Sequence, residues 1–287
     1  MPMLVIEGTY QVVGARPDGD SVRFYPNQPE HWNRVEGPHR VRLNASGGAQ
    51  LRLDGVDSLE THYSTEDGEV HQPLAQGQAA AQELLTWLGF TSVSRDQRET
   101  VTSAEPPKVP GYILTRGADV YGRCVAFAGR GAAPGDSGTS ITVDVNLLRA
   151  TANHHLLVQG AAYPTFYRKL YIDLRDELTT VTVQARASGI GLWAHDVTTT
   201  GAKVQGMESL TDELTIMPKL FRRLADYLAL GDGAAALDGF KDYLDARDDR
   251  LFVLSRGQWT GFDTLVEVID GTVRLARPPE DLVFDER

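Results

Sequence analysis

The sequence contains a single cysteine, Cys124, and therefore cannot form an intramolecular disulfide. It contains no apolar run approaching the ~18 residues of a membrane-spanning helix. Residues 1–10 lack both the basic start and the long apolar stretch of a secretory leader. Together these absences predict a cytoplasmic protein that folds around an apolar core, without disulfides and without a membrane partner.

Positive charge is also scarce. The formal net charge is −11, from 28 Lys and Arg against 39 Asp and Glu. This balance counts against binding of a polyanion such as nucleic acid, which clustered Lys and Arg favour. The excess is uneven, because residues 201–287 hold 17 acidic and 11 basic residues, whereas residues 1–200 hold 22 and 17. The N-terminal part is thus only mildly acidic, and a bound cation would offset part of its charge.

The chain is longer than one average domain, and its pattern changes near residue 200. Residues 197–206 have the composition of a linker. Beyond them lie helical and β-rich patterns, with Asp270-Gly271 as a hairpin turn. We therefore predict a first domain over residues 1–196 and a small α+β accessory unit over residues 207–287, whose function no motif indicates.

Within the first domain, β-rich runs and turn residues predict a hairpin over residues 9–25. A long excursion over residues 26–48 follows, without sustained periodicity, and a strand returns over residues 49–56. Apolar residues at helical spacing predict three helices. These helices cover residues 73–90, 146–159 and 168–187, and the mixed segments 91–101 and 112–128 are predicted strands.

Several short motifs carry acidic or basic side chains at predicted strand ends. Asp18-Gly19-Asp20 suits an ordinary turn, since Asp and Gly favour turns. The segment from Arg52 to Glu60 crowds oxygen-bearing side chains after a strand, and a polar loop would explain it equally well. Each motif alone therefore leaves both a structural and a functional interpretation open.

The order of the motifs along the chain is more specific than any one of them. The motifs are Asp18-Gly19-Asp20-Ser21-Val22, Arg52 with Asp57-Ser58-Leu59-Glu60, Asp119-Val120-Tyr121-Gly122-Arg123, Val145-Asn146 and Gly191-Leu192-Trp193. In this order, residues 9–196 resemble the staphylococcal nuclease (thermonuclease) family. The resemblance implies a five-stranded OB-type β-barrel with packed helices, and an α+β fold class for the whole chain.

The resemblance also implies a metal centre for hydrolysis of phosphodiester bonds. Asp20 and Asp57 would bind Ca²⁺ through their carboxylates, and Ser58 through its backbone carbonyl. Glu60 would orient or deprotonate the attacking water. These residue types suit the chemistry, because a hard cation takes oxygen ligands and polarises a phosphoryl oxygen as a Lewis acid.

Contacts with DNA or RNA follow from the same resemblance. Arg52 and Arg123 would hold the phosphate and stabilise its charge, a task that suits the planar guanidinium fork. The resemblance also implies that Tyr121, Phe166 and Tyr167 bind the substrate. For Phe166 and Tyr167, packing in the core is an equal alternative.

Two features depart from the family pattern or extend it. Leu59 stands where the family has proline, so the backbone before Glu60 is less fixed. The excursion over residues 26–48 joins the strand ends that lie away from the predicted metal. We therefore expect its side chains to be surface or partner residues rather than catalytic ones. These are His31, Trp32 and His39.

Two further functions compete with a nuclease. The first is a non-catalytic nucleic-acid-binding module on the same OB barrel, a fold that commonly binds single strands. The second places the function in residues 207–287, which would bind a protein partner or self-associate and so recruit the nuclease. The presence of all the acidic and basic motif residues favours the hydrolase.

Overall fold

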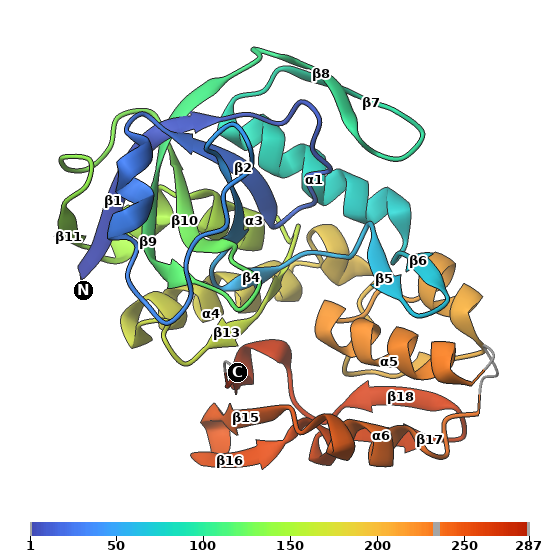
Figure 1. Ribbon diagram of the computed structural model, residues 1–287. Coiled ribbons are helices and arrows are strands. Elements are labelled where there is room, and N and C mark those ends of the chain that lie inside the picture. The colour runs from blue at the N-terminus through green and yellow to red at the C-terminus, as the bar shows by residue number, and fades with distance from the viewer. Residues whose placement is uncertain (1, 232–235, 286–287) are drawn as a thin grey trace.

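The computed structural model describes residues 2–231 and 236–285, and five of the strands close into a β-barrel (Figure 1). These strands are β1 (Pro2–Tyr10), β2 (Ser21–Pro26), β3 (Ala49–Leu53), β9 (Val109–Ala118) and β10 (Cys124–Arg130). The ring runs β1-β2-β3-β10-β9 and closes where β9 pairs with β1. Only the β3–β10 pair of this ring is parallel. The predicted OB-type barrel is confirmed.

Side chains along each strand alternate between the interior of the barrel and its outer face. In β3, Leu51 and Leu53 are fully buried, whereas Arg52 points to the other side of the sheet. Tyr10 closes the core because its hydroxyl donates to the carbonyl oxygens of Tyr112 and Gly129 at 2.7 and 2.9 Å. The barrel interior is thus apolar, and its charged residues are left at the rim and outer face.

The excursion over residues 26–48 forms the 3-10 helix η1 (Pro29–Arg34). Trp32 packs edge-on against Phe24, with ring centroids 6.2 Å apart, and its indole N–H donates to the Gly47 carbonyl. His31 is buried, and its Nδ1 lies 3.0 Å from the Ser137 hydroxyl. The expectation that these two aromatic residues lie on the surface is therefore wrong, because they cover one side of the barrel.

The helices begin and end at recognisable residues. The predicted helix over residues 73–90 is α1 (Leu74–Leu88), which ends at Gly89, whose φ of 117° is left-handed. The single helix predicted over residues 146–159 is wrong, since α2 (Val145–Arg149) and α3 (Ala152–Val158) are separate. Thr151 breaks it, because its side chain caps α3. The predicted helix over 168–187 is α4 (Ile172–Ala187).

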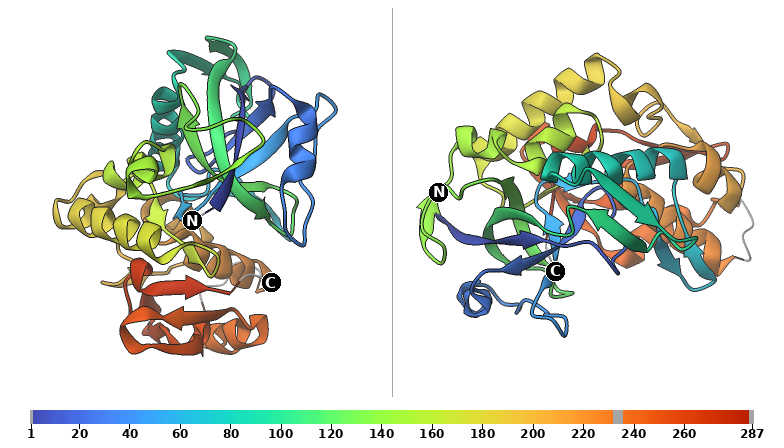
Figure 2. Two further views of the ribbon diagram at one scale, coloured as in Figure 1. Left: turned by 90° about the vertical axis from the view of Figure 1, so that its left-hand side faces the viewer. Right: turned by 90° about the horizontal axis from the view of Figure 1, so that it is seen from above.

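Short strand pairs surround the barrel (Figures 1 and 2). They join β4 (Val56–Asp57) to β12 (Tyr163–Pro164), β5 (Tyr63–Thr65) to β6 (Gly68–Val70), β7 (Ser92–Arg95) to β8 (Val101–Glu105), and β11 (Ser140–Thr142) to β1. In the described ranges, no helix is long and apolar enough to cross a membrane.

The C-terminal residues form the predicted α+β unit, of which residues 232–235 and 286–287 lie outside the described part. Its helices are α5 (Pro218–Leu230) and α6 (Phe240–Arg247), with a short π-helix over Ser209–Glu213. One sheet runs β13 (Phe166–Tyr167), β19 (Leu282–Phe284), β15 (Arg250–Val253), β16 (Gln258–Gly261). The other runs β14 (Ala202–Lys203), β18 (Thr272–Leu275), β17 (Val266–Ile269).

The C-terminal unit shares a hydrophobic core with the first domain. Leu59, Tyr163 and Trp193 of the first domain belong to the same buried cluster as Phe221 of α5. The predicted linker residues are folded as well, since Thr198 is fully buried and β14 pairs with β18. Figure 1 shows α5 beside the β5–β6 hairpin of the first domain. The two units are therefore packed against each other along the region that carries Glu60.

Shared packing predicts that damage to α5 unfolds both units. Phe221→Ala removes a buried ring that meets the Tyr63 ring at a centroid distance of 6.3 Å. We expect a loss of about 3–5 kcal/mol in the free energy of unfolding. Denaturant unfolding followed by tryptophan fluorescence and circular dichroism should show one transition with both probes.

The matched control is Leu230→Ala, because Leu230 lies on the same helix but is 59 % exposed. We expect this change to alter the free energy of unfolding by less than about 0.5 kcal/mol. Separate transitions for the two probes in the Phe221 variant would contradict a shared core.

Candidate active site

The first group of predicted site residues meets where β2 begins and β3 ends. Ser21 of β2 pairs with Arg52 of β3, and the Leu53 N–H donates to the Asp20 carbonyl at 2.8 Å. Asp57 follows in β4, after the turn that ends β3. The pairing of β2 with β3 therefore brings Asp20 and Arg52 together, and Asp57 lies close enough to both to act on their charges.

Gly19 permits a close approach between the first two motifs. A Cβ atom on this residue would lie 2.7 Å from the Cβ atoms of both Ser58 and Ala80, closer than real Cβ atoms come. Ser58 itself is buried, so it has little room to withdraw. The glycine between the two aspartates is thus required for packing, independently of any turn preference.

Asp20 has an unusually unfavourable setting for a charged carboxylate. Burial raises its pKa well above the usual range, and the nearby Asp18 and Asp57 raise it further, although Arg52 opposes them. Among the described residues, no Lys, Arg or His forms an ion pair with it within 4.0 Å. An acid in this setting either retains its proton or requires an additional cation.

Asp57 is 3 % exposed and has a partner that the sequence did not indicate. The Arg222 guanidinium of α5 donates to both of its oxygens, at 2.8 and 3.2 Å, and to Glu60 at 2.5 Å. Burial alone would raise the pKa of Asp57, but Arg222 and then Arg52 lower it below the usual value. The Asp57 carboxylate is therefore held in its charged form by two arginines.

Glu60 is placed firmly in spite of the missing proline. Its N–H donates to the side-chain oxygen of Gln72 at 3.2 Å, and the Gln72 N–H donates to the Glu60 carbonyl at 2.7 Å. Leu59 is buried in the core shared with the C-terminal unit, which explains an apolar residue at this position. Burial raises the pKa of Glu60, and Arg222 counteracts part of that rise.

Arg52 lies against Tyr167, one of the predicted substrate-binding residues. Its guanidinium donates to the phenol oxygen at 3.3 Å and stands 4.9 Å from the ring centroid. Burial would raise the pKa of Tyr167, but Arg52 and Lys219 lower it overall. Phe166, the preceding residue on β13, is fully buried and packs in the barrel core. Tyr167 is partly exposed and lines the cavity described below.

Arg123 and Tyr121 occupy the turn that leads into β10. Arg123 Nε donates to Asp119 at 2.7 Å, and the same carboxylate accepts from the Tyr121 and Arg123 N–H groups. The register pairs Val125 with Arg52, so Arg123 and Arg52 lie on the same face of neighbouring strands. Tyr121 is 74 % exposed. Arg123 is thus near the site but is bound to its own turn.

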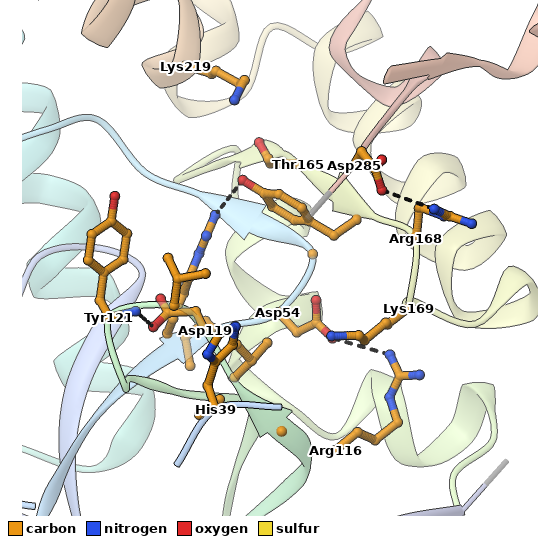
Figure 3. A pocket seen from close by; sticks show the side chains of 18 of the residues that line it. His39, Asp54, Arg116, Asp119, Tyr121, Thr165, Arg168, Lys169, Lys219 and Asp285 are labelled. Atoms are coloured by element: carbon orange, nitrogen blue, oxygen red, sulfur yellow. Dashed lines mark hydrogen bonds and ion pairs between the residues drawn. The ribbon is translucent and has the colours of Figure 1, made fainter. Parts of the chain in front are cut away.

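A cavity of about 770 Å³ adjoins this group, between the barrel and the C-terminal unit. Seven basic side chains line it, together with four aspartates and His39. Figure 3 shows Lys219 on one side of the cavity and His39 and Arg116 on another. Asp20, Asp57 and Glu60 do not line the cavity, and Asp20 and Asp57 adjoin it through Arg52. The basic residues are Arg52, Arg116, Arg168, Lys169, Lys219, Arg223 and Arg247.

The sequence did not indicate that the C-terminal unit lines this cavity. Lys219 and Arg223 lie one turn apart on α5, and each forms an ion pair with Asp249, at 3.2 and 2.6 Å. Burial lowers the pKa of Lys219. An amphipathic helix pattern gives no sign that its basic residues face a cavity. The one sequence feature that could have indicated this is the spacing of Lys219, Arg222 and Arg223, which places three basic residues on one side of α5.

The donor set was tested against the calcium ion that the resemblance implies. Asp20 and Asp57 lie close enough to raise the pKa of Asp20, which suits a shared cation. Within the described ranges, however, no three His, Cys, Asp or Glu side chains converge as metal ligands. Arg222 already holds Asp57 and Glu60. In this arrangement the residues do not fit a calcium ion, and calcium binding stays a prediction.

No protein-family model matches the chain, and no curated protein matches it significantly.

Asp20 should weaken the fold at neutral pH, because its pKa is raised in the folded protein. Its charge is disfavoured there at any pH above about 3.9, the usual pKa of Asp, and has no effect well below that value. We expect Asp20→Asn to raise the thermal midpoint at pH 7 by about 2–4 °C, measured by calorimetry in EDTA. The difference should disappear near about pH 3.

Asp136→Asn is the control, since Asp136 lies in an exposed loop. We expect its midpoint to match that of the unaltered chain at both pH values. A lower midpoint for Asp20→Asn at pH 7 would mean that the Asp20 charge is stabilised in the fold.

Proposed function

We propose that the chain is a phosphodiesterase that hydrolyses nucleic-acid strands, with Arg52 at the reaction centre. One observation carries this proposal. In an acidic protein, seven basic side chains gather around one cavity, and Arg52 connects its wall to buried carboxylates. Such a local reversal of charge supports an anionic ligand. The resemblance to the staphylococcal nuclease family supports a phosphodiester.

Arg52 is suited to bind the phosphate. Its guanidinium is oriented by the Tyr167 ring and hydroxyl, and the nearby Asp20 and Asp57 keep it charged. A fixed guanidinium can donate two parallel hydrogen bonds to phosphate oxygens without reorganising. A donor of this kind typically lowers the barrier by about 2.7–4 kcal/mol. Arg123, on the same face, would add positive charge if it exchanged Asp119 for phosphate.

Glu60 is the proposed base. Its raised pKa brings it closer to a working pH than an exposed glutamate. The Glu60 carboxylate would take a proton from water, the water oxygen would bond to phosphorus, and the bond to the leaving sugar oxygen would break. The leaving oxygen would then accept that proton back from the Glu60 carboxyl group, through water, which restores the carboxylate. No step here depends on calcium, which remains an expectation from the resemblance.

The substrate is proposed to be a single strand of DNA, RNA or both. The cavity lies in the size range of small-ligand sites, which suits one or a few nucleotides rather than a duplex. Tyr121 at its rim is exposed enough to stack on a base. OB barrels commonly present such a face to single strands.

Quenched single-stranded DNA and RNA oligonucleotides test the proposal directly. We expect cleavage by the unaltered chain and a loss of about 10²–10³ in rate for Arg52→Gln and Glu60→Gln, because each removes a group acting in the transition state. Arg256→Gln is the control, since Arg256 is an exposed residue outside the cavity. Thermal midpoints should show that all variants are folded.

The second candidate is a non-catalytic module that binds single strands. It is favoured by one observation, namely that Arg222 neutralises Asp57 and Glu60 and that neither lines the cavity. Fluorescence anisotropy with the same oligonucleotides separates the two functions. Binding that depends on Arg52, with no cleavage in calcium or in EDTA, would favour the module. Partner binding or self-association through residues 207–287 stays a prediction, which light scattering on the full chain would test.

A further inference from the structure

Arg222 forms ion pairs with two carboxylates of this site, Asp57 and Glu60. It reaches Asp57 through two nitrogens and Glu60 through one of them. All three side chains are shielded from water, with exposed fractions of 20 % for Arg222, 4 % for Asp57 and 17 % for Glu60. Such shielding makes each charge dependent on its partners.

The helix that carries Arg222 is anchored on both sides of this residue. Ahead of α5, the Gln72 side chain donates to the Ile216 carbonyl at 2.8 Å. One turn after Arg222, Asp226 accepts from the Tyr63 hydroxyl at 3.0 Å. Phe221 is fully buried between these anchors. The guanidinium therefore extends from a fixed base in a shared core, and not from a hinged lid.

The guanidinium takes up the carboxylate oxygens that a divalent cation would need. Both oxygens of Asp57 are engaged, and the guanidinium bridges them to a second carboxylate. A bound Ca²⁺ would require the same oxygens. Arg222 brings one positive charge rather than two, but it adds directed, charge-assisted hydrogen bonds. The two cations therefore cannot both occupy these carboxylates.

We propose that Arg222 is the resident cation of this carboxylate site, holding Asp57 and Glu60 in the place that a divalent cation would take. It acts as a positioning residue for Arg52 and Glu60, in a role that rests on the proposed function. Calcium must compete with it, so the unaltered chain should bind its phosphodiester ligand without any divalent cation. The positive charge comes instead from α5, which also supplies Lys219 and Arg223 to the cavity.

Calcium titration by isothermal calorimetry, without substrate, tests the proposal. We expect calcium binding to the unaltered chain to be weaker than to Arg222→Gln by about a hundredfold or more, because a buried ion pair must be broken in the former. Arg222→Lys should give an intermediate affinity, since an ammonium group keeps the charge but cannot donate the two parallel hydrogen bonds that Arg222 gives to Asp57. Asp20→Asn in the Arg222→Gln chain should abolish the new site.

Equal calcium affinity in the unaltered chain and in Arg222→Gln would overturn the proposal. Absence of calcium binding in both chains would overturn it too, because the carboxylates would then form no cation site. Arg223→Gln is the matched control, since it removes the same charge from the next residue of α5 and should leave calcium affinity unchanged. If Arg222→Gln does not fold, Arg222→Lys against the unaltered chain decides by the same criterion.

Oligonucleotide binding in EDTA gives a second, independent measurement on the unaltered chain. We expect the affinity to be the same in EDTA and in calcium, and a tenfold or greater gain with calcium would contradict the proposal. The proposed hydrolysis can fail separately. If no chain cleaves any oligonucleotide, the phosphodiesterase is refuted, whereas the calcium series still decides the role of Arg222.

Discussion

Three carboxylates drawn together with little access to water, Asp20, Asp57 and Glu60, impose the constraint on which this structure depends. Burial disfavours the charged form of each, and proximity makes the problem worse for Asp20. The three carboxylates are not compensated equally. Arg222 forms ion pairs with Asp57 and Glu60, whereas Asp20 interacts only more weakly with Arg52. The site therefore has two carboxylates with a counter-charge and one, Asp20, whose charged form is disfavoured. Asp20 is the one next to the β2–β3 hairpin.

The same constraint explains why an acidic C-terminal third supplies basic residues to the cavity. Residues 201–287 carry 17 acidic against 11 basic residues, yet Lys219, Arg222 and Arg223 all point toward the first domain. Asp249, which also lines the cavity, forms ion pairs with Lys219 and Arg223. The net charge of a segment thus says little about the surface that it contributes to an interface.

The barrel was predicted from the order of the motifs and the resemblance that they carry, and local sequence explains why two of the predicted site residues lie together. Asp20 and Arg52 belong to neighbouring strands of one hairpin, so alternation and turn chemistry place them together. Arg222 lies 165 positions from Asp57, and an amphipathic helix does not reveal which tertiary partner its arginines will meet. Thr151 was overlooked because its capping hydrogen bond competes with an otherwise continuous helical pattern. Phe166 could not be distinguished from Tyr167 by sequence, and the structure shows that Phe166 is buried in the barrel core while Tyr167 lines the cavity.

The pairing of β13 with β19 has a consequence for biosynthesis. Tyr167 is held beside Phe284 by the last described strand, and that strand follows α5 in the chain. The barrel can be synthesised completely before either the support of Tyr167 or Arg222 has left the ribosome. During that interval Asp57 and Glu60 have no counter-charge from α5. The ion pairs of Arg222 with Asp57 and Glu60 can therefore form only after α5 has been synthesised.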